Sequence, residues 1–184
     1  MIVGASTPRI DGIEKVTGEA MFTGDLAIPG ILEAKVLRSP LPHALIESID
    51  TSKAESSPGV MGILTRDDLK DIDPYYGNCL RDRAVVAIYR VRFVGEPVAV
   101  VAAENALVAE EALSLIDVEY RELPCVPDMD AALAEGAPRL HAHMASSGEF
   151  HDVSGVGAEF GGNICHREQF VKGNPNTQFG GAEE

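Results

Sequence analysis

The glycine-rich run at residues 155–162 is the first candidate for chemistry, because closely spaced glycines let a backbone loop approach a phosphate. Its spacing, GxGxxxG, differs by one residue from the dinucleotide-binding fingerprint, and no apolar strand precedes it. The residues that follow, 163–166, do not have the pattern of a helix start, so we expect no helix dipole to hold a pyrophosphate. We therefore interpret this run as a Gly-rich linker.

Histidines and cysteines near the C-terminus are the second candidate. His141 and His143 would point the same way on a strand, and Cys165 with His166 would complete four zinc ligands. Adjacent Cys and His side chains rarely bind one ion, however, and nothing in the sequence fixes the residues between the two pairs. We predict no metal site, and keep a small metal-dependent enzyme built on this tail only as a third alternative.

Nucleophilic catalysis is the remaining possibility that the residue types raise. His43 lies between Pro42 and Ala44 and could act as a base. No serine has the spacing of a nucleophile elbow, and no pair of carboxylates has neighbours that would raise one pKa. The residues alone therefore predict no catalytic site.

Composition limits the class of protein further. The chain has 184 residues, 45% of them hydrophobic, and a net charge of −14, which is typical of a globular protein with one sizeable core. No basic stripe suits a nucleic acid, and no apolar run approaches the roughly 18 residues of a membrane span. Three cysteines (Cys79, Cys125 and Cys165) predict no disulfide framework, so we expect a reduced, cytoplasmic protein.

The acidic charge is uneven: residues 93–184 hold 16 of the 29 acidic side chains and only 4 of the 15 basic ones. A solvated acidic face is the simpler interpretation, and a docking surface for a basic partner is the alternative.

The elements that must position any site follow from hydrophobic periodicity. We predict strands at 31–39, 44–50, 60–64, 98–103 and 116–121, with helices at 51–57, 66–70, 104–115 and from Asp128 or Asp130 to Glu135. The strand, helix and strand over 98–121 predict a right-handed βαβ core. Leu107, Leu113 and Leu115, together with small alanines, should form the buried side of its helix. The fold class expected is α/β, an α+β mixture with a mixed sheet.

Three segments lack this periodicity. Residues 1–18 are expected to be an irregular arm, and residues 71–84 a long loop. Residues 141–184 contain 8 of the 18 glycines and predict an irregular tail or linker. We expect residues beyond about 145 to be poorly ordered or to pack against a second copy of the chain, giving a homo-oligomer through the tail.

Several of these segments also match a family pattern in the right order. The sequence resembles the molybdenum-binding large subunit of the xanthine dehydrogenase/aldehyde oxidase family over roughly residues 4–140. The matching motifs are RIDGIEKVTGEAMFTGD at residues 9–25, LRSPLPHA at 37–44, PGV at 58–60 and VRFVGEPVA at 91–99, followed by VEYRELP at 118–124.

The resemblance implies an α/β hammerhead domain at residues 1–140, with a tail at 141–184 that in the family leads to the molybdopterin-binding domain. Complete enzymes of this family oxidise a substrate carbon with a molybdopterin-type molybdenum cofactor, iron–sulfur clusters and, in many members, FAD. It also implies partners: a molybdopterin-binding domain or chain, an iron–sulfur subunit and an FAD subunit. The chain itself is expected to bind none of these cofactors and to have a structural and assembly role; the alternative is an autonomous, non-catalytic binding module.

No residue is therefore assigned to catalysis, to a cofactor or to a metal. Candidates for structural or interface roles are Asp11, Lys15, Arg38, His43, Gly95, Glu96 and Pro97. We expect the sequence Gly95-Glu96-Pro97 to form a tight turn just before the buried strand, because Pro97 fixes φ at the first strand residue. The Glu96 carboxylate is expected to accept hydrogen bonds from backbone amides in this turn.

Overall fold

A computed structural model describes residues 3–4, 6–77, 82–141, 163–164 and 172–173. Its helices and 3-10 turns are α1 (Gly12–Thr17), η1 (Thr23–Asp25), α2 (Ser52–Glu55), η2 (Arg66–Leu69), α3 (Ala106–Leu113) and α4 (Met129–Leu133). Its strands are β1 (Glu33–Arg38), β2 (Ala44–Asp50), β3 (Val60–Leu64), β4 (Tyr75–Tyr76), β5 (Arg83–Ala84), β6 (Arg90–Val91), β7 (Pro97–Ala103) and β8 (Asp117–Glu122). Within the described ranges, no helix has the length and apolar character needed to cross a bilayer.

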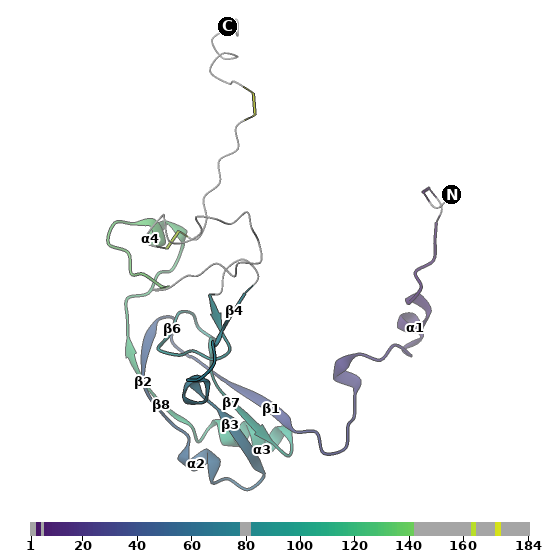
Figure 1. The fold of residues 1–184 in the computed structure, drawn as a ribbon, viewed down its shortest axis with the longest axis horizontal. Coiled ribbons are helices and arrows are strands. Elements are labelled where there is room, and N and C mark those ends of the chain that lie inside the picture. The colour runs from purple at the N-terminus through teal and green to yellow at the C-terminus, as the bar shows by residue number, and fades with distance from the viewer. Residues whose placement is uncertain (1–2, 5, 78–81, 142–162, 165–171, 174–184) are drawn as a thin grey trace, which may run out of the picture.

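The described strands form two three-stranded sheets and one short hairpin, and every pairing among them is antiparallel. In the first sheet β7 lies between β1 and β3, so that Val100 is paired with Val36 on one side and Leu64 on the other. In the second sheet β2 lies between β6 and β8. Figure 1 shows α2 and α3 beside the first sheet, at the end of the domain opposite α4.

Strand β7 is continuously apolar because both of its faces are covered. Ala99, Val101 and Ala103 join a cluster that includes Ala109 and Ala112 of α3. Val98, on the opposite face, packs with residues of the second sheet and its flanks: Ala44, Ile46, Ala87 and Val91. The strand thus joins two apolar clusters, and the prediction of a strand buried on both faces is confirmed.

The predicted βαβ core and mixed sheet are wrong. The strand, helix and strand exist, but β7 belongs to the first sheet and β8 to the second, and the described strands of both sheets pair only antiparallel. A βαβ unit needs both strands in one parallel sheet, whereas here each strand finds partners far away in the sequence. Periodicity reports the type of an element and carries no information about its neighbours in a sheet.

The prediction for the buried side of α3 is also wrong in part. Leu107 is 68% exposed and Leu115 is 40% exposed, whereas Ala109 and Ala112 are fully buried. Leu113 does pack, half-buried, against the cluster, and the small side chains of Ala109 and Ala112 let α3 approach β1 and β7 closely.

Two segments expected to be irregular contain regular structure. Residues 71–84 include the hairpin of β4 and β5. The predicted irregular arm contains α1, which buries no residue and is closed by Gly18 in the left-handed conformation. Ile10, Ile13 and Val16 recur every three residues, which is a helical spacing, but the helix buries none of its residues against the described domain.

The segment that reaches away from both sheets extends past the predicted arm, to residue 32 (Figure 1). We call residues 6–32 the N-terminal arm from here on. Its large apolar side chains are exposed, namely Ile10, Ile13, Val16, Met21, Phe22, Leu26, Ile28, Ile31 and Leu32. Ile10, Ile13 and Val16 are the most exposed of them, at 72% or more of their surface.

Candidate functional site

The residues singled out from the sequence lie in three places. Asp11 and Lys15 form an ion pair with a separation of 2.5 Å on the arm. His43 lies just before β2. Arg38, on the other hand, is brought to the Gly95–Pro97 turn by the pairing of β1 with β7, in which Arg38 faces Pro97.

The turn is held by hydrogen bonds to the end of β1. Arg38 Nη1 donates to the carbonyl of Gly95 at 2.8 Å, the amide of Gly95 donates to the carbonyl of Ser39 at 2.8 Å, and the amide of Ser39 donates to the carbonyl of Glu96 at 2.9 Å. Gly95 has a φ of 93°, which side chains with a Cβ rarely adopt. The backbone geometry explains why glycine precedes Glu96 and Pro97 here.

Glu96 is only 6% exposed and binds Arg92 twice. One carboxylate oxygen accepts a hydrogen bond from Arg92 Nη1 at 3.0 Å, and the other accepts from the backbone amide of Arg92. Arg92 Nε in turn donates to the carbonyl of Leu140 at 3.2 Å. The pair therefore links the turn before β7 to the segment that follows α4.

His43 has a different environment. It is 3% exposed, its Nδ1 lies 2.7 Å from the carbonyl oxygen of Pro124, and its own carbonyl accepts the amide of Leu123 at 2.9 Å. Its Nε2 is buried and has no hydrogen-bond partner among the described residues. These contacts fasten the start of β2 to the chain that leaves β8.

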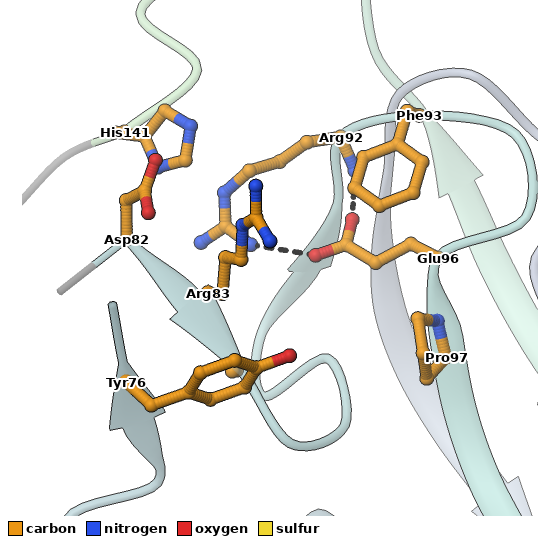
Figure 2. A pocket seen from close by; sticks show the side chains of 9 residues that line it. Tyr76, Asp82, Arg83, Arg92, Phe93, Glu96, Pro97 and His141 are labelled. Atoms are coloured by element: carbon orange, nitrogen blue, oxygen red, sulfur yellow. Dashed lines mark hydrogen bonds and ion pairs between the residues drawn. The ribbon is translucent and has the colours of Figure 1, made fainter. Parts of the chain in front are cut away.

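A cavity of about 350 Å³ opens beside the Arg92–Glu96 pair. Figure 2 shows its polar side chains, which include Arg83 from β5, Asp82 and His141. Its apolar wall is formed by Phe93, Pro97 and the ring of Tyr76. The cavity lies where the hairpin, the turn before β7 and the start of the tail meet.

The charges around the cavity act on His141. Burial lowers the pKa of its imidazole, and the positive charges of Arg92 and Arg90 lower it further, while Asp82 opposes this. The ring is therefore neutral at neutral pH, and it can act as a hydrogen-bond donor or acceptor.

Neither of the candidate sites near the C-terminus can be located in the structure. The glycine run at 155–162 lies outside the described residues, as do His143, Cys165 and His166 and most of the predicted tail. Within the ranges that are described, no three His, Cys, Asp or Glu side chains converge as metal ligands.

Residues that the sequence analysis missed complete the site. Arg92 lies four residues before Glu96, but the segment between them is a turn and not a helix, so no spacing rule pointed to the pair. Arg83 and Tyr76 come from a hairpin that the pattern did not predict. Asn163 lies beside the domain. Its side-chain oxygen accepts a hydrogen bond from the amide of Leu140 at 3.0 Å, and its side-chain nitrogen donates to the carbonyls of Ala132 and Pro138.

Comparison with known proteins gives a consistent result. A family model described as "Aldehyde oxidase and xanthine dehydrogenase, a/b hammerhead domain" matches residues 17–124. A probable xanthine dehydrogenase subunit of Bacillus subtilis (strain 168) is 40% identical over 174 residues, which is 95% of this chain and 21% of that protein. The xanthine dehydrogenase molybdenum-binding subunit of Escherichia coli O157:H7 is 40% identical over 144 residues, covering 72% of this chain and 19% of that one.

The fold agrees with solved structures as well. Quinoline 2-oxidoreductase from Pseudomonas putida 86 superimposes with a TM-score of 0.68 at 36% identity, over 78% of this chain and 19% of that chain. The expected hammerhead fold is thereby confirmed. The chain spans about a fifth of the length of the relatives that it matches.

Proposed function

Since the chain belongs to the aldehyde oxidase and xanthine dehydrogenase family through its a/b hammerhead domain, we propose that it is a structural and assembly element of a molybdenum hydroxylase large subunit. In this role it supplies no catalytic residue and binds the rest of the same enzyme. The partners proposed are the molybdopterin-binding part of the large subunit, an iron–sulfur subunit and an FAD subunit, in the cytoplasm. An autonomous binding module with the same fold is the alternative.

The exposed apolar surface of the arm is the observation that carries this proposal. Ile10, Ile13 and Val16 lie on or beside α1, which buries none of its residues. Burial of apolar surface is favourable, and an apolar patch of this kind indicates a surface for another protein. Because the relatives are about five times longer than the chain, we propose that the arm packs on the remainder of the large subunit.

The cofactors of the complete enzyme are proposed to be a molybdopterin-type molybdenum cofactor, iron–sulfur clusters and FAD. The described residues do not fit a metal ion or an iron–sulfur cluster as a binding site. They offer no convergent set of metal ligands, and exposed Cys125 is the only cysteine among them, whereas an iron–sulfur cluster is held by several thiolates. We therefore derive no redox step from this chain.

Recovery of the tagged chain from its source cells tests the proposal, with molybdenum analysis and mass spectrometry of the eluate. We expect molybdenum to be recovered together with chains that match the remaining four fifths of the relatives. Recovery of the chain alone, without molybdenum, would contradict the assembly role and favour the autonomous module.

A further inference from the structure

The cavity beside the Arg92–Glu96 pair contains one guanidinium that makes no direct ion pair with another described residue. The guanidinium of Arg92 binds Glu96 and the carbonyl of Leu140. The guanidinium of Arg83 faces the same cavity (Figure 2), yet among the described residues it makes no ion pair or hydrogen bond. A guanidinium has five N–H donors in a planar fork that suits a carboxylate, so Arg83 offers an open position for an anion.

The other charges define which anion fits. Glu96 balances Arg92, and Asp82 lies at the edge of the cavity beside His141 (Figure 2). Arg92 and Arg83 are matched in number by Glu96 and Asp82. A doubly charged phosphate would meet both carboxylates with no net positive charge to offset them, whereas a single carboxylate needs only the open donor fork of Arg83. A monoanion is therefore favoured over a dianion.

The apolar wall defines the body of the ligand. Tyr76 and Phe93 expose about half of their surface, at 53% and 55%, and Pro97 adds an apolar contact at the start of β7. Aromatic rings prefer to stack on flat groups, and a cavity of about 350 Å³ is at the lower end of the range for small-molecule sites. A flat, compact ligand makes the best use of this wall.

We propose that the cavity binds a small aromatic carboxylate, with its carboxylate on Arg83 and the free N–H groups of Arg92, and its ring against Tyr76 and Phe93. The ring of His141 contributes a further hydrogen bond. This site does not depend on the assembly role, because all of its residues belong to this chain and none of them lies on the arm.

Titration of the full 184-residue chain with benzoate, followed by NMR or calorimetry, tests the site. Benzamide has the same shape without the charge, and inorganic phosphate has charge without the ring. We expect saturable binding of benzoate, with benzamide and phosphate at least about tenfold weaker, since hydrogen bonds to a charged group account for about that ratio.

Two variants locate the binding. Arg83→Gln should weaken benzoate binding about tenfold. Lys53→Gln, which removes the same charge from an exposed position in α2, should leave it unchanged. The side chain of Arg83 is exposed and makes no ion pair or hydrogen bond within the described chain, so its replacement should not disturb the pairing of β5 with β4 or the fold. Three results would each overturn the proposal. The first is equal affinity of the chain for benzoate and benzamide. The second is binding of benzoate by Arg83→Gln as tight as that by the unmodified chain, and the third is a lack of saturable binding of benzoate.

Discussion

The carboxylate of Glu96 binds both the guanidinium and the backbone amide of Arg92, so that one buried side chain holds the residue four positions before it at two points. Arg92 passes this restraint on to Leu140 through Nε. The motif VRFVGEPVA therefore encodes a folded connection between the turn before β7 and the exit of the domain.

Replacement of Glu96 by Gln should destabilise the fold by about 3 kcal/mol, because it leaves the largely buried guanidinium of Arg92 without a counter-charge. Urea unfolding of the two proteins measures this difference. The control is Glu110→Gln, whose side chain is 73% exposed and lies 3.9 Å from Lys35, and which should change stability by less than about 1 kcal/mol. Equal stability of Glu96→Gln and the unmodified chain would show that the pair is dispensable.

Replacement of Ala109 by Leu should lower the free energy of unfolding by about 1–3 kcal/mol, because the alanine side chain is fully buried where α3 packs on the first sheet. The control, Glu111→Leu, places a leucine at an exposed position of the same helix. Its free energy of unfolding should differ from that of the unmodified chain by less than about 0.5 kcal/mol. Thermal or urea unfolding of both variants gives the comparison. A well-tolerated leucine at position 109 would mean that α3 does not pack closely.

The sequence predicted where the strands lie but not how they pair, and both outcomes have one physical cause. Alternation at 116–121 and the apolar run at 98–103 are local signals, and they predicted β8 and β7 to within one residue at each end. The pairing of Glu33 with Ala103, and the separation of β7 and β8 into different sheets, depend on contacts between distant segments. The local pattern is the same in either arrangement, so the topology could not be predicted from it.

The candidate site was predictable to a similar degree. Glycine and proline around Glu96 revealed the turn, because their backbone preferences are strong. Arg83 and His141 approach Glu96 only after the hairpin and the start of the tail have folded onto the domain. No spacing in the sequence encodes that approach.

Asn163 provides a test of how the chain leaves the domain. Its side-chain amide binds the amide of Leu140 and two carbonyls, so Asn163→Ala should accelerate hydrogen exchange at the amide of Leu140. The matched control is Asn105→Ala, which removes the cap that accepts the amide of Val108 at 3.0 Å. Each variant should accelerate its own amide only. Unchanged exchange of Leu140 in Asn163→Ala would rule out this contact.

Stability should depend on pH through His141. Burial and Arg92 lower the pKa of its imidazole below the ordinary value of 6.5. As the pH falls through that value, the unfolded chain takes up a proton that the folded chain resists, so the contribution of His141 is fully present at higher pH and is lost on acidification. In His141→Gln the fall in the free energy of unfolding between about pH 7.5 and about pH 5.5 should be smaller. Identical falls in the two proteins would exclude His141 as a source of the pH dependence.

The assembly role is tested most directly by charging the arm. Ile13 and Val16 of α1 are exposed, and α1 buries none of its residues. The double variant Ile13→Asp with Val16→Asp should therefore leave the stability of the domain unchanged. The control introduces the same two charges at exposed positions outside the arm, as Met61→Asp with Leu107→Asp. The measurement is the amount of molybdenum that copurifies with each tagged chain from its source cells. We predict that the arm variant loses the molybdenum that the unmodified chain and the control retain; equal recovery with all three chains would contradict the role assigned to the arm.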